Sequence, residues 1–444
     1  MLRLALAALS LSLLFPLTAA AQGVDSPHAG GPDPQLPQPE SKADALLGGD
    51  LLTSQDSQEV KQRTYATPGL PKKADNFTSY KGEYFSIRLG FVALADYNAF
   101  SQDADSEKQV GAQRDQWDTR SLRFLLSGGI GPKSFRTHYY ASYSFAGFNE
   151  DGKETWSFAD LTLTLPSGKL GALTFGKTKE WFVYEMSGDA TFLPQVERVL
   201  NPFFTSRDIG VVLNNAVFDK RLSYRVGWFN DGWIHGMSAA TDSNHVTARV
   251  TGLVATNTDG SRYLHLAVDG RYAEALDGTI QLQGRAESNV SSYYVDTGKI
   301  PARNQKEVAF ESLWTHDGYS INAEYVRSWV DATQVADPSF YGFYVTGSWI
   351  ITGEHRPYDR NVGYARRPIP RRRLGAVEVV ARYSHVDLDD KSVHGGVMDR
   401  ETLAVNWYPN RFWKLAVAGG VVNLDRAGLN GLTWIIQPRI QFFY

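Results

Sequence analysis

The stretch YFSIRLGFVALADY, residues 84–97, has an apolar side chain at every odd position and several polar ones at the even positions. Successive side chains of a β-strand point to opposite faces, so this alternation predicts a strand with one apolar and one polar face. The strand would be roughly twice as long as a typical strand of a soluble protein. Its apolar face would carry Phe85, Ile87, Leu89, Phe91, Ala93, Ala95 and Tyr97, and its polar face Ser86, Arg88, Gly90 and Asp96.

The same alternation recurs as far as the C-terminal stretch LTWIIQPRIQFFY, residues 432–444, and Tyr or Trp often lies near the strand ends. Inside a bilayer every backbone polar group must be paired, and a closed sheet achieves this. Long alternating strands with aromatic ends therefore predict an all-β fold that forms a transmembrane β-barrel. The alternative is a large secreted β-sandwich, whose strands would be about half as long.

The N-terminal residues differ from the rest of the chain. Arg3, the apolar run 4–17 and the alanines before Gln22 predict a cleaved signal peptide over residues 1–21. Residues 22–80 are rich in Pro and Gly and predict a periplasmic lead without a packed core, followed by the barrel over 81–444. The chain has no cysteine, which excludes thiol chemistry and cysteine-based zinc sites.

The strand count decides the side on which each connector lies. About seventeen segments after residue 80 have the pattern of strands, but a bacterial single-chain barrel has an even number. Short connectors at 131–134, 166–169, 216–220, 316–318 and 409–410 predict periplasmic turns, and 179–207 predicts a long extracellular loop. Counting strands from either end of the barrel region gives the connectors the same sides only if one candidate is not a membrane strand. The segment to leave out is TIQLQGRAES, residues 279–288, which then belongs to an extracellular loop of roughly 274–305. The sequence thus predicts a 16-stranded antiparallel barrel with an aqueous lumen.

The stretch ARRPIPRRR, residues 365–373, concentrates arginines in a chain whose net charge is −3. The strand count places it in a long periplasmic connector, 354–373, which we expect to fold back toward the lumen. Guanidinium groups match phosphate and carboxylate geometry, so lumenal arginines would favour anions. Solvated turn residues and arginines that contact lipid headgroups are the alternatives for this stretch.

Further arginines lie on the polar faces of predicted strands, namely Arg88, Arg136, Arg271 and Arg382. Each could line the pore and contact an anion. Alternatively each could pair with a carboxylate of the wall, for which Asp96, Asp160, Asp269, Glu311 and Glu378 are candidates. The nine histidines show no spacing that indicates a metal site, and we predict no catalytic residues, no metal site and no cofactor.

Motifs spread along the barrel region carry a family resemblance. They are FGKTKEWFVYE (175–185), QVERVLNPFF (195–204), YLHLAVDGRYAEALDG (263–278), TGEHRPYDR (352–360), GAVEVVARYSHVDLDD (375–390) and LAVNWYPN (403–410). Across roughly residues 80–444 the chain resembles the phosphate-selective porin O/P family of outer-membrane channels. The resemblance implies a 16-stranded barrel with inward-folded loops in each subunit of a homotrimer, and a ladder of arginines that favours anions.

Carried over by motif, Arg198 resembles the family's constriction-loop arginine, and Arg367 the basic residue of its inward-folded periplasmic turn. Arg120 and Arg123 resemble the arginines at the start of the family's second strand. Arg285 resembles the one arginine that is retained from a cluster of arginines in a family loop. Where family members for phosphate carry more arginines, this chain has Gln281, Gln283, Gly284 and Ser121. The thinner ladder implies anion preference and leaves selectivity for phosphate open.

The sequence therefore predicts a porin of the bacterial outer membrane for the passive diffusion of small anions of the phosphate or polyphosphate type. The expected partners are these anions, outer-membrane lipid and lipopolysaccharide, and two further copies of the chain, with no nucleic acid. One alternative is a general or cation-preferring nutrient channel, which the pI near 6.3 favours. The other is a barrel-borne hydrolase, for which no ordered nucleophile–base pair stands out.

Overall fold

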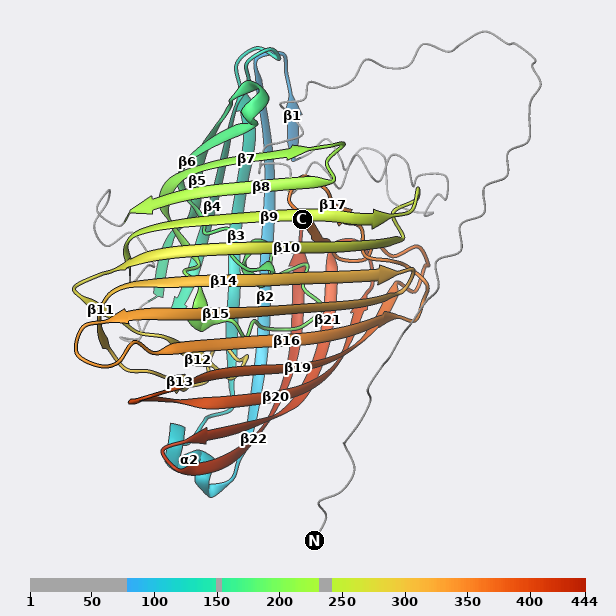
Figure 1. Cartoon of the computed structure of the whole chain (residues 1–444). Coiled ribbons are helices and arrows are strands. Elements are labelled where there is room, and N and C mark those ends of the chain that lie inside the picture. Colours follow the sequence, from blue (N-terminus) through green and yellow to red (C-terminus); the bar gives the residue numbers. More distant parts are fainter. Residues whose placement is uncertain (1–77, 149–153, 231–241) are drawn as a thin grey trace, which may run out of the picture. The chain divides into compact units, whose positions relative to one another are not determined.

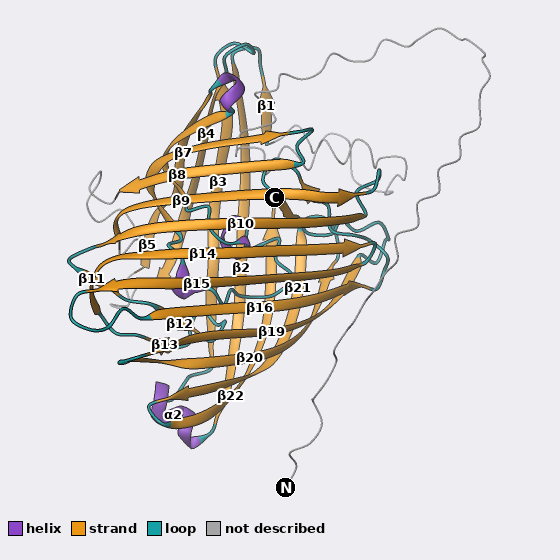
Figure 2. Ribbon diagram, viewed as in Figure 1, coloured by secondary structure: helices purple, strands orange, loops and turns teal. Residues whose placement is uncertain are grey.

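The computed structural model describes residues 78–148, 154–230 and 242–444. In these ranges, sixteen long strands form a closed antiparallel β-barrel (Figures 1 and 2). The expected signal peptide, 1–21, and residues 22–77 of the expected lead lie outside the described residues. No helix in the described ranges is long and apolar enough to cross a membrane.

The barrel strands follow one another in chain order, and each pairs with its neighbours. They are β2 (Phe85–Gln102), β3 (Gln116–Ile130), β4 (Thr137–Phe148), β5 (Glu154–Pro166), β6 (Ala172–Lys179), β7 (Arg207–Val217), β8 (Leu222–Asn230), β9 (Asp242–Thr256), β10 (Arg262–Ala275), β14 (Ile300–His316), β15 (Tyr319–Ala332), β16 (Ser339–Ile350), β19 (Ala376–Asp390), β20 (Val393–Tyr408), β21 (Trp413–Arg426) and β22 (Leu429–Phe443). Pairing of β22 with β2 closes the barrel.

Short elements complete the described chain. β1 (Ser79–Lys81) adds to the edge of β2, and β11 (Thr279–Ile280) pairs with β14. Two hairpins lie outside the barrel sheet, β12 (Gln283–Arg285) with β13 (Tyr293–Asp296), and β17 (Tyr358–Asp359) with β18 (Tyr364–Ala365). The helical turns are α2 (Ala104–Val110), η3 (Gly168–Leu170), α3 (Tyr184–Ser187) and η4 (Asn201–Phe203).

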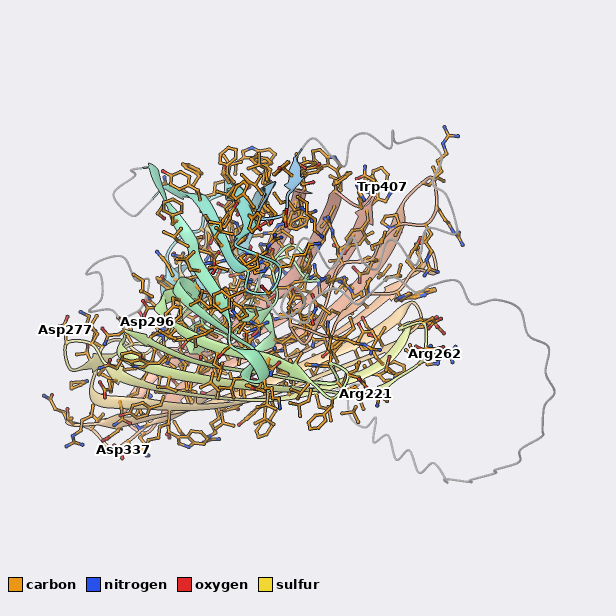
Figure 3. The ribbon with its side chains drawn as sticks, turned by 90° about the horizontal axis from the view of Figure 1, so that it is seen from above. Arg221, Arg262, Asp277, Asp296, Asp337 and Trp407 are labelled. Carbon is orange, nitrogen blue, oxygen red and sulfur yellow. The ribbon has the colours of Figure 1, made fainter. Side chains whose placement is uncertain are left out.

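The structure confirms the predicted strand count and the segment left out of it. Residues 276–299, between β10 and β14, form a connector, so 279–288 is not a membrane strand. β14 begins at Ile300, earlier than predicted, because a register shift between Ala302 and Asn304 interrupts the alternation near its start. Figure 3 shows Arg221 and Arg262 at one end of the barrel and Asp277, Asp296 and Asp337 at the other, as the alternating connectors require.

Along most barrel strands, inward and outward side chains alternate among the described residues as predicted. Leu89, Phe310 and Leu403 are 50%, 53% and 67% exposed on the outer face, whereas Asp96 on the inner face is 1% exposed. On the outer face of β15, Tyr319 and Trp329 are both exposed. Ten residues of a strand tilted by about 45° rise by roughly 23 Å, which matches the apolar band between the aromatic girdles of such barrels.

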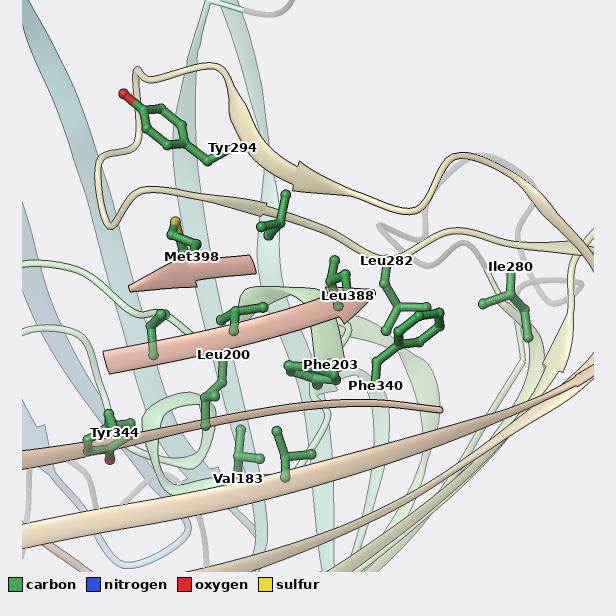
Figure 4. Packing of buried hydrophobic residues seen from close by; sticks show 14 of the residues in the cluster. Val183, Leu200, Phe203, Ile280, Leu282, Tyr294, Phe340, Tyr344, Leu388 and Met398 are labelled. Atoms are coloured by element: carbon green, nitrogen blue, oxygen red, sulfur yellow. The ribbon is translucent and has the colours of Figure 1, made fainter. Parts of the chain in front are cut away.

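Three connectors fold into the lumen: residues 180–206 and 276–299 from the extracellular side, and 351–375 from the periplasmic side. Figure 4 shows Val183, Leu200 and Phe203 of the first packed with Leu282 of the second against Phe340 of the wall. This apolar cluster lies inside the barrel, where a polar lumen is expected. It holds the two extracellular segments against the wall and narrows the channel.

Candidate functional site in the lumen

Four of the nine predicted arginines surround one cavity in the extracellular half of the lumen. Its volume is about 350 Å³, and Arg120, Arg198, Arg271 and Arg285 line it together with Glu197 and Glu287. Arg198 comes from the 180–206 segment, hereafter the constriction loop, and Arg285 from the 276–299 segment, hereafter the vestibule loop. Arg120 and Arg271 project from the extracellular halves of β3 and β10. The fold thus brings together residues that lie far apart in the sequence.

Glutamates of the constriction loop attach it to arginines of the barrel wall. Glu180 accepts a hydrogen bond of 2.5 Å from Arg271 Nε. Glu197 accepts 2.6 Å and 3.1 Å bonds from Arg120 and a 2.7 Å bond from Arg439. Two of the predicted anion-pathway residues, Arg120 and Arg271, therefore hold the loop in place as well as lining the cavity.

Glu185 is the centre of the loop's attachment. Its side chain is fully buried and lies 2.7 Å from Arg382 Nη2. It also accepts hydrogen bonds from the backbone nitrogens of Val199 (3.0 Å) and Leu200 (3.2 Å). One carboxylate thus ties the two arms of the loop to each other and to β19. Between them, Arg198 Nε donates to the Glu185 carbonyl at 2.5 Å, which aims the guanidinium into the cavity.

The other predicted arginines have local partners. Arg136 donates to the carbonyl oxygens of Gly131 and Glu83 and so holds a periplasmic turn. Arg123 Nε donates to Ser121 Oγ at 2.7 Å. Arg285 lies over the ring of Tyr293, with 4.3 Å between the guanidinium carbon and the ring centroid. Arg88 faces the lumen near the periplasmic end of β2, opposite Ser127 of β3.

The periplasmic connector folds inward as predicted for 354–373. Arg356 makes 2.7 Å bonds to both carboxylate oxygens of Glu378 on β19. Arg249 of β9 binds Glu311 at 2.6 Å and donates to the carbonyl oxygen of Val362 at 3.0 Å. These contacts, all buried, fix the connector, hereafter the periplasmic insert, to β19 on one side and to β9 and β14 on the other.

The periplasmic insert and the constriction loop meet inside the lumen. Arg356 Nη1 donates to the carbonyl of Phe192 at 2.8 Å, and Ala365 N donates to the hydroxyl of Tyr184 at 3.0 Å. The rings of Phe192 and Tyr364 stack with centroids 6.1 Å apart. Segments that enter from opposite ends of the barrel thus support each other at its middle.

The arginines of the stretch 365–373 lie in two different environments. Arg366 pairs with Asp359 of the same insert, and Arg367 is 2% exposed, with its guanidinium carbon 4.7 Å from the ring centroid of Phe443. Burial lowers the pKa of Arg367 to about 10, so it remains charged at neutral pH. Residues 371–373 are exposed at the periplasmic rim. Arg367 lies inside the barrel, and the last three arginines do not.

Sequence reasoning missed other lumenal arginines. Arg249, Arg400 and Arg439 are fully buried on inner faces of β9, β20 and β22, and strand parity could have identified all three. Arg356 lies in the periplasmic insert, where no periodicity marks it. The candidate wall carboxylates do pair with arginines, but Asp96 binds Arg439 and Asp160 binds Arg207. None of the described residues forms a group of three His, Cys, Asp or Glu side chains suited to a metal ion.

The ion pairs of Glu197 predict that the constriction loop stays attached to the wall only above a certain pH. Burial alone would raise the pKa of Glu197, but Arg120 and Arg439 outweigh it and lower the pKa to about 2 from 4.5. Because the folded pKa is depressed, the stabilisation is complete above about pH 4.5 and is lost as the pH falls toward 2. We expect steady single-channel current from pH 7 to about 4 and increasing flicker below it. Flicker that already grows between pH 7 and 5 would contradict this attachment.

Comparison with known proteins agrees with this architecture. The family model described as phosphate-selective porin O and P matches residues 91–430. The chain is 23% identical to Porin O of Pseudomonas aeruginosa over 376 residues, which cover 75% of this chain and 82% of that protein. It is also 25% identical over 158 residues to an uncharacterized protein of Caulobacter vibrioides, covering 34% of this chain and 32% of that protein.

Among solved structures, the anion-selective porin from Comamonas acidovorans superposes with a TM-score of 0.54 at 12% sequence identity. The match covers 81% of this chain and 100% of that porin. At this identity the likeness shows the fold alone, a closed β-barrel. The chain belongs to the phosphate-selective porin O and P family and is a porin of the bacterial outer membrane.

Proposed function

We propose that this porin passes small anions, including those of the phosphate type, by passive diffusion along an arginine-lined lumen. The observation that carries the proposal is the cavity of about 350 Å³ in which four arginines face two glutamates. Arg120 is paired with Glu197, and Arg271 with Glu180 and Glu307. The ion pairs of the described residues include none for Arg198 or Arg285, so these two arginines supply the positive potential of the cavity. A positive potential in a narrow, low-dielectric passage concentrates anions and excludes cations.

Arg198 is the residue best suited to touch the passing anion. Its Nε is held by the Glu185 carbonyl, and its side chain lines the cavity. Burial and the neighbouring Arg120 lower the pKa of Arg198 to about 10, so the group stays charged at neutral pH. Arg367 supports the same pathway near its periplasmic side. Sites that are spaced along the lumen can each bind weakly enough to release the anion.

Reversal potential in planar bilayers tests the proposal. Under a KCl gradient, we expect anion selectivity for the wild-type channel and a clear loss of it for Arg198→Ala. Arg367→Ala should show a smaller loss, because its guanidinium is largely covered by Phe443. Arg372→Ala is the matched control, since this arginine is exposed at the rim and outside the cavity. A cation-selective wild-type channel would exclude anion preference.

A general or cation-preferring channel is the second candidate, and the pairing of lumenal arginines favours it. Arg249, Arg356, Arg382 and Arg439 each bind a carboxylate and so contribute less net charge to the lumen. The same reversal-potential measurement separates the two, because a general channel would give a value near zero and would respond little to Arg198→Ala.

We also propose that the porin assembles as a homotrimer, contacts lipopolysaccharide through its extracellular rim, and turns over no substrate. Membership of a porin family supports the trimer, and the outer-membrane location supports the contact with lipopolysaccharide. The channel fold supports the absence of turnover. Native mass spectrometry in detergent should give a mass three times that of the mature chain. A purely monomeric species in mild detergent would contradict assembly, and hydrolase assays on the same sample address catalysis.

A further inference from the structure

The cavity of about 350 Å³, hereafter the vestibule, is lined on one side by two glutamines and one arginine of the vestibule loop, hereafter the ladder. Gln281, Gln283 and Arg285 line the cavity from alternate positions of the vestibule loop. Leu282, between the two glutamines, faces away from the cavity and belongs to the apolar cluster. Gln283 and Arg285 lie at alternate positions of β12, and Gln281 precedes this short strand by two residues.

The neutral members of the ladder offer acceptors as well as donors. An amide side chain carries a carbonyl acceptor and two N–H donors. Gln281 Nε2 already donates to Asp296 Oδ1 at 2.8 Å and to Gln283 Oε1 at 3.5 Å, so Gln283 presents its amide N–H groups to a ligand. Across the cavity, the Nε2 atom of Gln305 donates to Glu307 and to Ser328. In Gln281 and Gln305 the carbonyl oxygen is therefore the group left to meet a ligand, and this oxygen can only accept.

Acceptors in an anion-binding cavity require a ligand that also donates. Inorganic phosphate near neutral pH presents mainly acceptor oxygens, which the arginines satisfy and the glutamine carbonyls repel. A hydroxylated organic anion satisfies both kinds of group, because its oxyanion binds guanidinium and its hydroxyls donate to the amides. The volume of about 350 Å³ also falls within the range of sites for organic ligands, well beyond the size of one phosphate.

We infer that the vestibule selects polyhydroxylated organic anions, of which sugar phosphates are the representative, over inorganic phosphate. This inference rests on the proposed anion function. The oxyanion lies between Arg198 and Arg285, and the sugar hydroxyls extend along Gln283 and Gln281. The vestibule loop that carries the ladder is held on the far wall, where Gln437 Nε2 donates to the Glu287 carbonyl at 3.0 Å. The ladder is consequently a fixed surface.

Block of the KCl current by added solutes tests the inference. The probes are glucose 6-phosphate, inorganic phosphate and glucose, applied to the wild-type channel in planar bilayers. We expect glucose 6-phosphate to half-block at a concentration about tenfold lower than inorganic phosphate, since two or three further hydrogen bonds form. Glucose, which lacks the oxyanion, should block least. Equal or stronger block by inorganic phosphate would overturn the inference.

Variants of the ladder provide the second arm. Gln281→Ala/Gln283→Ala should reduce the preference for glucose 6-phosphate to roughly twofold or less. Gln281→Arg/Gln283→Arg should shift the preference toward inorganic phosphate. Gln334→Ala is the matched control, because Gln334 is exposed in another extracellular turn and does not line the cavity. An unchanged solute preference in both double variants would overturn the assignment to this ladder.

The two arms separate failure of this inference from failure of the proposed function. A cation-selective reversal potential of the wild-type channel would remove both. Anion selectivity without preference for glucose 6-phosphate would remove only the ladder's role and leave an unspecialised anion porin. Heat-modifiable electrophoretic mobility of each variant verifies that its barrel has closed before the current is measured.

Discussion

Replacing Glu185 with alanine is expected to release the constriction loop and to raise the single-channel conductance. The carboxylate binds Arg382 and the backbone nitrogens of Val199 and Leu200, all in buried surroundings. Two buried N–H groups would lose their acceptor, at about 1–3 kcal/mol each, and Arg382 would lose one of its two carboxylate partners. With the loop no longer held against β19, we expect conductance to rise on the order of twofold and to become noisy.

Single-channel recording of Glu185→Ala beside Glu107→Ala measures this effect. Glu107 is an exposed glutamate of α2 and loses the same atoms without touching the lumen. Glu185→Gln should give an intermediate conductance, since an amide oxygen can still accept from Val199 and Leu200. Wild-type conductance in both Glu185 variants would show that the loop is held by other contacts.

Replacing Arg356 with alanine is expected to destabilise the lumenal assembly the most. Glu378 would remain fully buried with only Asn406 and Tyr408 as donors among its described hydrogen bonds. Removing one partner of a buried ion pair typically costs about 3–5 kcal/mol. The carbonyl of Phe192 would also lose its donor, so the periplasmic insert and the constriction loop would separate.

Urea unfolding of the reconstituted porin, followed by tryptophan fluorescence, measures the loss. The double variant Arg356→Ala/Glu378→Ala should recover most of it, because the lone buried charge is then absent. Arg373→Ala removes an arginine exposed at the periplasmic rim and should leave the unfolding curve unchanged. A double variant as unstable as Arg356→Ala would show that the connection to Phe192, and not the charge, carries the stability.

Part of the candidate site could be predicted because it depends on motif and parity. Arg120, Arg198, Arg271 and Arg285 were each predicted from the sequence, and all four line one cavity. Their partners could not be predicted in the same way. The carboxylates that meet the lumenal arginines include Glu180, Glu185 and Glu197, which lie in a loop without periodicity. Only the inward fold of that loop brings them to Arg271, Arg382 and Arg120.

The sequence by itself determined the barrel, its sixteen strands and the side of each connector. Lipid outside and a polar lumen inside impose a period of two on the strands, and a bacterial single-chain barrel has an even number of them. The strand pattern and the strand number can therefore be recognised in the sequence. The tertiary structure alone decided which charges meet. Asp96 and Arg439 are separated by 343 residues and Glu185 and Arg382 by 197, and barrel closure or loop insertion brings each pair together. Such contacts depend on positions across the lumen, which no local pattern records.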